Sequence, residues 1–291
     1  MKSILVPVDF SKSSENAAYY AFYLAKHLKA NIILCHAIYI PIEVPIDSFG
    51  RWPGYNFETL REESTKILED LALQMRNYGN TFHDQCVFQP QITFVAEVGE
   101  ATDVIINLGN REKAQLIIMG MKGAGGFTDC LFGSKSRNMI DKSTLPLVLV
   151  SEDFQIKPIR KIAFAASLAD DEISTINALV SFANYFNANL LVAHVSDKNV
   201  ENEKDLKRIE SFLNDVTCKI NYDKIYFRNV DQADVDQGLD WLGEYGMVDL
   251  LVMVHCHKGT LDRLFASHTH FRANHLNVPL MVLPGGLYPI F

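Results

Sequence analysis

Hydrophobic residues along this chain form short uncharged runs that alternate with longer segments in which apolar residues recur every three or four positions. The first run, residues 3–9, ends at Asp9, and the segment that follows to about residue 29 begins with a cluster of serines. Short apolar runs are typical of strands buried on both faces of a parallel sheet, and the second spacing is that of an amphipathic helix. The pattern therefore predicts a strand followed by a helix.

The alternation continues through the first half of the chain. Further strands are predicted at residues 32–37, 92–95, 116–119 and 146–150, and further helices at residues 57–77, 100–113 and 134–142. Between them, residues 40–56 hold three prolines, two glycines and Trp52, which predicts an ordered but irregular insertion. Strands that alternate with helices in this way indicate an α/β fold, an open parallel five-stranded sheet flanked by helices.

The second half repeats this order of elements. Strands are predicted at residues 162–165, 190–195, 224–227, 250–254 and 279–283, and helices at residues 172–186, 203–213 and 235–245. The two halves end on similar strands, Pro-Leu-Val-Leu-Val at residue 146 and Pro-Leu-Met-Val-Leu at residue 279. A recurring unit of this kind indicates duplication. We therefore predict two tandem domains, residues 1–152 and 160–285, joined by a short polar link that contains Pro158.

Composition narrows the class of protein. Of the 291 residues, 48% are hydrophobic, which is ample for packed cores, and the formal net charge of -8 argues against a partner with a phosphate backbone, so no nucleic acid is expected. No uncharged apolar run approaches the length that spans a membrane, and no signal peptide is visible. The five cysteines are scattered, without metal-site or disulfide-framework spacing. We expect a cytoplasmic protein that has no membrane partner.

Glycines cluster after the predicted fourth strand. Gly120 and Gly123 are followed by Gly133-Ser134 at the start of the next helix, in the spacing Gly-x2-Gly-x9-Gly-Ser. Glycine lets backbone amides approach a phosphate closely, and a helix N-terminus favours an anion. A glycine pair alone also fits a flexible connection between a strand and a helix. The alternative is a phosphate site past the carboxyl end of a central strand.

Taken as a whole, the pattern at residues 4–11 and 117–150 resembles the ATP-binding branch of the universal stress protein family, and the resemblance covers nearly the full chain as two copies. It implies a Rossmann-like fold of the adenine nucleotide alpha hydrolase type. It also implies that Asp9 accepts hydrogen bonds from base or sugar, that ATP, AMP or ADP is the ligand, and that Mg or Mn is shared with the phosphates. The implied nucleotide-binding residues are Pro7, Val8, Asp9, Ala37, Met119, Gly120, Gly123, Gly133, Ser134, Lys135 and Ser136.

The second half departs from this pattern. When the halves are aligned on their last strands, Val254, His257 and Ala266 replace the three glycines, and Ser167 replaces Asp9. This half is therefore not expected to bind ATP in the manner of the family. Five of the nine histidines fall within residues 255–275, and imidazole suits zinc, nickel or copper. One reading is a zinc site formed by His255, His257, His268 and His270. Ordinary hydrogen-bonding histidines, or a pH-sensitive loop, are the alternatives.

No catalytic set is apparent, because neither a Walker A pattern nor a G-x-S-x-G nucleophile occurs. We expect a nucleotide-binding regulatory protein of the stress response, which is non-catalytic or at most a slow ATPase and acts on an unidentified protein partner. An enzyme that hydrolyses an adenine nucleotide, and a metal- or ligand-binding scaffold that uses the second domain, are the alternatives.

Single-domain members of the family pair through their last strands. The resemblance therefore implies that residues 146–150 and 279–283 pair within one chain, so that the two domains form an intrachain pseudo-dimer, and a homodimer of such chains is a further possibility. The insertion carries Phe49, Trp52 and Tyr55, which either cover the nucleotide site, form an interface or form a buried flap.

Overall fold

A computed structural model describes residues 2–39, 57–79, 88–121, 134–169, 171–197, 203–232, 238, 241–243, 246–255 and 278–285. The contacts of the chain divide it into two compact units, unit 1 (Met1–Gly120) and unit 2 (Met121–Phe291). The predicted insertion at 40–56 lies outside the described residues. Most of the glycine-rich loop after β4 and most of the histidine-rich loop after β9 lie outside them as well. The predicted domain limits, 1–152 and 160–285, stay a prediction.

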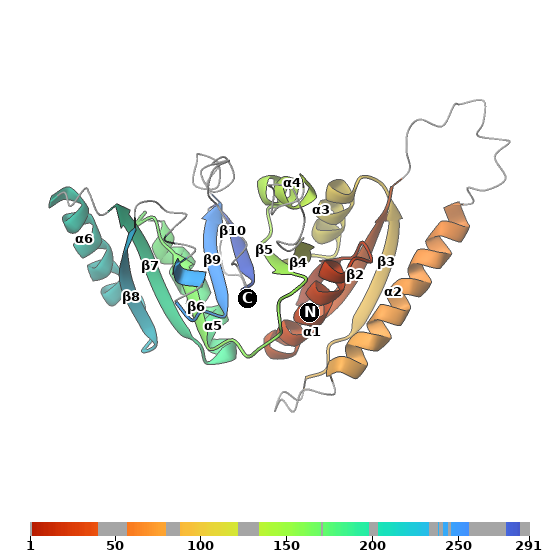
Figure 1. The fold of residues 1–291 in the computed structure, drawn as a ribbon, viewed down its shortest axis with the longest axis horizontal. Coiled ribbons are helices and arrows are strands. Elements are labelled where there is room, and N and C mark those ends of the chain that lie inside the picture. The colour runs from red at the N-terminus through yellow and green to blue at the C-terminus, as the bar shows by residue number, and fades with distance from the viewer. Residues whose placement is uncertain are drawn as a thin grey trace, which may run out of the picture. The chain divides into compact units, whose positions relative to one another are not determined.

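Unit 1 alternates strands and helices as the hydrophobic pattern predicts (Figure 1). In chain order the elements are β1 (Ser3–Pro7), α1 (Lys12–Leu28), β2 (Asn31–Ile38), α2 (Phe57–Gly79), β3 (Ile92–Val98), α3 (Ala101–Arg111) and β4 (Leu116–Met121), whose last residue already belongs to unit 2. The strands run parallel in the order β3-β2-β1-β4. Crossovers between parallel strands are right-handed, so α1 and α2 cover one face of this sheet and α3 covers the other.

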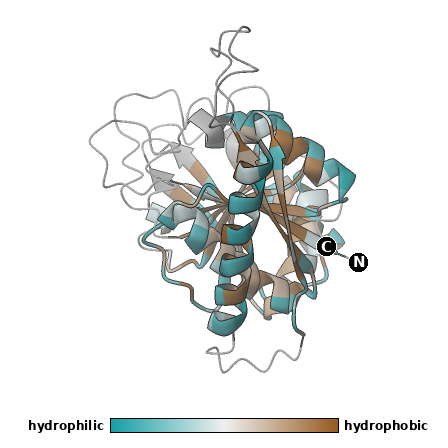
Figure 2. Ribbon diagram, turned by 90° about the vertical axis from the view of Figure 1, so that its right-hand side faces the viewer, coloured by the Kyte–Doolittle hydropathy of each residue, from teal (hydrophilic) through white to brown (hydrophobic). Residues whose placement is uncertain are grey.

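The start of unit 1 shows why its sequence folds this way. Ser11 caps α1 by accepting a hydrogen bond from the backbone amide of Ser14, and Lys29 ends the helix in the left-handed conformation. The apolar face of α1 is buried against a strand, β1, that is itself buried over most of its length. In Figure 2 the brown, hydrophobic colour accordingly lies on the strands, and the teal colour lies on the outer faces of the helices.

Unit 2 contains α4 (Ser134–Lys142), β5 (Leu147–Ser151), β6 (Lys161–Ala165), α5 (Glu172–Phe186), β7 (Asn189–Asp197), α6 (Glu203–Lys219), β8 (Ile225–Gln232), β9 (Leu250–His255) and β10 (Leu280–Pro284). Its strands follow the order β5-β10-β9-β6-β7-β8. All of these neighbours are parallel except β5 and β10, which pair antiparallel with Leu280 opposite Leu149. The predicted pairing of the two similar last strands is therefore confirmed.

Most predicted elements are present, and among those of unit 2 that are longer than predicted, α6 and β8 differ most. α6 continues six residues beyond the predicted end at residue 213, because Val216 and Ile220 are buried one and two turns after the buried Phe212. β8 continues to Gln232. Among the described strands it pairs with β7 alone, at the edge of the sheet, and its side chains at Tyr226, Arg228 and Asn229 are exposed. Of the helix predicted at 235–245, residues 238 and 241–243 are described, and they are helical.

The segments from the first to the second strand of each unit repeat the same backbone at an offset of 158 residues. Ile4 lies opposite Ile32 in unit 1, and Ile162 lies opposite Leu190 in unit 2. The residue three positions after the first strand adopts the left-handed conformation in both units, with φ of 62° at Phe10 and at Leu168. This agreement in non-repetitive backbone supports duplication of one ancestral domain. No helix among the described segments has the length and hydrophobicity needed to cross a membrane.

Candidate nucleotide site

The order of strands in unit 1 creates a switch point between β1 and β4. From β1 the chain crosses to β2 and then to β3 on one side, and it returns to add β4 on the opposite side of β1. In open α/β sheets, the crevice outside the carboxyl ends of the strands at such a point is where ligands bind. The loop that begins at Asp9 follows β1 directly, and Gly120 lies at the carboxyl end of β4. Both are therefore placed at this crevice.

A compact hydrogen-bond network shapes the loop between β1 and α1. The exposed carboxylate of Asp9 accepts hydrogen bonds through Oδ1 from the Ser11 amide at 3.1 Å and from the Ser11 hydroxyl at 2.5 Å. The Asp9 amide donates to the hydroxyl of Ser14 at 3.3 Å, and that hydroxyl donates to the Ser11 carbonyl at 2.9 Å. The Asp9 carboxylate is thus oriented by the first turn of α1 while it remains open to solvent.

Gly120 touches this same helix start. A Cβ atom at position 120 would lie 2.4 Å from the carbonyl carbon of Ser13 and 2.6 Å from the amide nitrogen of Ser14. Both atoms belong to the backbone, so they cannot move aside as a flexible side chain can. Glycine is therefore required here by packing alone, and the same close approach brings the ends of β1 and β4 together.

His36 is a further residue of the site that the sequence reasoning missed. Its Nδ1 lies 2.7 Å from the carbonyl oxygen of Val8, and because a carbonyl oxygen only accepts, Nδ1 carries the proton. Its ring packs against the ring of Phe10, with centroids 4.4 Å apart. His36 thereby ties the end of β2 to the backbone immediately before Asp9. The sequence did carry a signal for this residue, because the second half has a histidine, His194, at the equivalent position. His194 makes the equivalent contact, with its Nδ1 2.9 Å from the carbonyl oxygen of Ala166.

The model of the universal stress protein family matches residues 1–151. The chain belongs to the universal stress protein family. Universal stress protein MJ0531 of Methanocaldococcus jannaschii is 25% identical over 151 residues, which cover 52% of this chain and 82% of that protein. Universal stress protein MJ0577 of the same organism is 29% identical over 162 residues, covering 51% of this chain and 94% of that protein.

Solved structures extend the likeness in fold to both halves. A universal stress protein from Archaeoglobus fulgidus matches with a TM-score of 0.69 over 98% of each chain, at 16% identity. A putative universal stress protein from Pseudomonas aeruginosa matches with a TM-score of 0.61 over 98% of this chain and 93% of that chain, at 13% identity. The resemblance inferred from the residues, and the predicted α/β fold class, are confirmed.

The structure describes part of the nucleotide-binding set that the family resemblance implies. Pro7 is half-buried, Val8 is buried and Asp9 is exposed, and Gly120 lies on the neighbouring strand β4. Ala37 is half-buried on β2, and Met119 is buried within β4. The remaining members lie elsewhere: Ser136 is buried on α4, Ser134 and Lys135 begin α4 with side chains outside the described set, and Gly123 and Gly133 lie outside the described residues. Their binding roles stay predictions.

The equivalent loop of unit 2 has different chemistry on the same backbone. Glu172 occupies the position of Ser14 and is buried, with 6% of its surface exposed. Its carboxylate accepts hydrogen bonds from the Ser167 amide at 2.9 Å, the Ser167 hydroxyl at 2.8 Å and the Ala169 amide at 3.3 Å. An internal carboxylate therefore already satisfies the amides of this loop, and Ser167 offers no outward acid.

The predicted histidine site can be examined only at His255. This residue ends β9, and its Nε2 lies 3.7 Å from Oδ1 of Asp141 on α4. His257, His268 and His270 lie outside the described residues, and within the described part of the chain no group of three or more potential metal ligands occurs. The zinc site stays a prediction.

Proposed function

We propose that the N-terminal half of this universal stress protein binds one adenine nucleotide, ATP or AMP, and that the chain acts as a nucleotide-responsive regulator without significant turnover. The observation that carries the proposal is that Asp9 and Gly120 both approach the first turn of α1. The exposed carboxylate of Asp9, after β1, is oriented by Ser11, and Gly120 of β4 lies so close to the backbone of Ser13 and Ser14 that it permits no side chain. Both residues lie at the switch point of the sheet.

Each part of the crevice fits one part of a nucleotide. The Asp9 carboxylate is suited to accept hydrogen bonds from ribose hydroxyls or the amino group of the base. Pro7 and Ala37, half-buried at the ends of the neighbouring strands β1 and β2, would offer apolar surface to the base. Phosphates would reach the loop after β4, where Gly123, Gly133 and residues 134–136 follow, and Mg or Mn shared by phosphate oxygens would offset their charge.

The geometry around Asp9 favours binding over hydrolysis. The hydroxyls nearest to it, Ser11 and Ser14, hydrogen-bond to the loop and to the Asp9 carboxylate. They are therefore engaged in shaping the loop and are poorly placed to orient a water molecule for attack on a distant phosphate. Phosphoryl transfer relies on such positioning. We expect nucleotide exchange with the solvent and a nucleotide-dependent contact with a protein partner.

The test is a calorimetric titration of the full chain with Mg-ATP, ADP and AMP, run beside a measurement of ADP released from ATP over hours. We expect saturable binding and ADP release no faster than in a sample of the Asp9→Ala variant. ADP that accumulates with time in the parent chain and is lost in both Asp9→Ala and Ser134→Ala would instead establish an ATPase. Absence of binding to all three nucleotides would overturn the proposal.

A further inference from the structure

Two serine hydroxyls at the start of α1 form a hydrogen-bond relay that ends on the Asp9 carboxylate. The Ser11 hydroxyl lies 2.5 Å from Oδ1 of Asp9, and the Ser13 hydroxyl lies 3.0 Å from the Ser11 hydroxyl. An ionised carboxylate only accepts, so the single proton of the Ser11 hydroxyl is donated to Asp9. The Ser13 hydroxyl therefore donates to Ser11, and the relay runs in one direction, from Ser13 through Ser11 to Asp9.

The relay is anchored to two elements that border the candidate nucleotide site. Ser13 is buried, and a Cβ atom at Gly120 would lie 2.5 Å from the Ser13 carbonyl oxygen, so the backbone of Ser13 abuts the carboxyl end of β4. The Ser11 hydroxyl oxygen also accepts a hydrogen bond from the Ser14 amide at 3.3 Å, which is the bond that caps α1. Packing against β4 and the first turn of α1 therefore fix where the relay lies.

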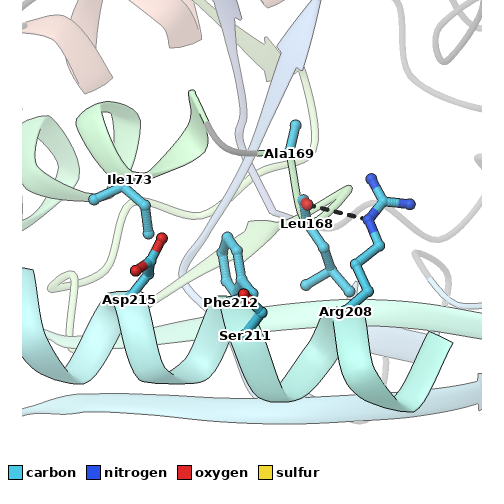
Figure 3. Close-up of a pocket in the computed structure, with 7 residues that line it drawn as sticks. All are labelled: Leu168, Ala169, Ile173, Arg208, Ser211, Phe212 and Asp215. Atoms are coloured by element: carbon cyan, nitrogen blue, oxygen red, sulfur yellow. Dashed lines mark hydrogen bonds between the residues drawn. The ribbon is translucent and has the colours of Figure 1, made fainter. Parts of the chain in front are cut away.

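Unit 2 shows that the loop keeps its conformation without this relay. At the offset of 158 residues, Ala169 replaces Ser11 and Asp171 replaces Ser13, while φ is 62° both at Phe10 and at its equivalent Leu168. Figure 3 shows this loop of unit 2 at Leu168 and Ala169, where a methyl group replaces the hydroxymethyl group of Ser11. The two hydroxyls of the relay are therefore not required for the turn of the backbone.

A different position holds the loop in both units. In unit 1 the Ser14 hydroxyl accepts from the Asp9 amide at 3.3 Å, and in unit 2 the Glu172 carboxylate accepts from the equivalent Ser167 amide at 2.9 Å. Ser14 and Glu172 are equivalent residues, and both are buried. The structural task thus belongs to this position, whereas the serines of the relay occur in the one of the two loops that carries the acid.

We propose that Ser11 and Ser13 are positioning residues for the nucleotide, because their relay holds the Asp9 carboxylate in the orientation that binds it. The inference rests on the proposed function, the binding of an adenine nucleotide beside Asp9. The hydroxyl and the amide of Ser11 both bind Oδ1, so the carboxylate loses less rotational freedom when the ligand binds. Ser13 acts through Ser11, since each bond in a chain of hydrogen bonds polarises the next.

The test is a calorimetric titration of the full chain with AMP, carried out on the parent, Ser11→Gly, Ser11→Thr and Ser13→Ala. Glycine is nearly as good an N-cap as serine, so Ser11→Gly removes the donor to Asp9 at little cost to α1. We expect the affinity for AMP to fall about fivefold in Ser11→Gly and about two- to threefold in Ser13→Ala. Ser11→Thr keeps both the hydroxyl and the cap, and its affinity should equal that of the parent.

The matched control is Ala169→Gly, which places glycine at the equivalent position of unit 2 and should leave the affinity for AMP unchanged. A role in capping alone would also leave Ser11→Gly unchanged, so a loss there that threonine restores is specific to the hydroxyl. Equal affinities in the parent, Ser11→Gly and Ser13→Ala would overturn the inference and leave the proposed function standing. The same holds for a loss in Ser11→Thr or Ala169→Gly as large as that in Ser11→Gly. Absence of AMP binding by the parent chain would instead overturn the proposed function, and this inference with it.

Discussion

The β1–α1 loop of unit 1 and the β6–α5 loop of unit 2 share one backbone and differ in where their carboxylate points. In unit 1, Asp9 extends from the end of the strand into solvent and is steadied by Ser11. In unit 2, Glu172 reaches back from the helix and is buried under the loop that it holds. The comparison shows that a duplicated loop can keep its conformation while an outward, solvent-exposed acid is exchanged for an inward, structural one.

The largest effect is expected from placing the unit 2 residue in unit 1, as Gly120→Val. Its Cβ would lie 2.4 Å from backbone of α1, so the helix start must shift. We expect a loss of about 3 kcal/mol in the free energy of unfolding, at the upper end for overpacking, and a loss of nucleotide affinity beyond detection. Urea unfolding and calorimetric titration measure the two quantities.

Gly285→Ala is the matched control for this substitution, because the nearest atom to a Cβ at position 285 is the His255 carbonyl oxygen, at 3.3 Å. Its effect on unfolding should be clearly smaller, and nucleotide affinity should not change. An unchanged affinity in Gly120→Val would contradict the close approach of β4 and α1 on which the site depends.

The next effect concerns the carboxylate of unit 2. Glu172→Ala removes a buried carboxylate and leaves the amides of Ser167 and Ala169 without their acceptor in a partly buried loop. We expect a loss of about 2 kcal/mol in the free energy of unfolding, because hydrogen bonds to a charged group are lost. Ser14→Ala, the equivalent change in unit 1, should cost only about 1 kcal/mol, since it removes a neutral hydroxyl. Equal losses in urea unfolding would argue against a structural role specific to Glu172.

The two equivalent histidines give a finer comparison. His36→Ala and His194→Ala each remove a ring that ties the second strand of its unit to the backbone after the first strand. Each is expected to lower the free energy of unfolding by about 1 kcal/mol. Only His36→Ala should also weaken nucleotide binding, by several-fold, because it loosens Val8 beside Asp9. Calorimetric titration of both variants tests this, and an equal loss of affinity in the two would count against a site in unit 1.

The smallest effect leaves stability untouched and concerns thiol reactivity. Burial raises the pKa of the Cys35 thiol well above its ordinary value, with the nearby Glu97 carboxylate as a second cause, whereas Cys218 is exposed. The thiolate is the reactive form. At neutral pH, iodoacetamide should therefore label Cys218 and spare Cys35 until the protein is denatured. Peptide mass mapping shows the order, and early labelling of Cys35 would mean that β2 opens readily.

The sequence predicted the alternation of elements well because buried parallel strands and amphipathic helices leave strong patterns. Helices α4 and α5 match their predicted ranges, and the pairing of β5 with β10 was expected from the family resemblance. β8 was predicted too short because an edge strand carries polar residues that resemble a loop. Edge position is a property of the sheet and not of the local sequence.

The sequence analysis named residues of the candidate site, but it did not predict the contacts between them. Gly120 was assigned to phosphate approach, and the structure adds a packing reason, since the helix that it touches begins more than a hundred residues earlier. The contact of His36 with Val8 joins residues 28 positions apart, so it also depends on tertiary approach. The contact of Glu172 with Ser167 spans only five positions, but neither segment alone shows that it replaces the role of Ser14. Alignment of the two halves residue by residue is the signal that would have revealed them.

The most direct test of the central claim is the stoichiometry of AMP binding measured by calorimetry on the full chain, on Asp9→Asn and on Ser167→Ala. The account predicts one site per chain, an affinity about tenfold lower in Asp9→Asn, where a charge-assisted hydrogen bond becomes a neutral one, and no change in Ser167→Ala. Two sites per chain, or an affinity that responds to Ser167→Ala and not to Asp9→Asn, would contradict the assignment of the nucleotide to the N-terminal half.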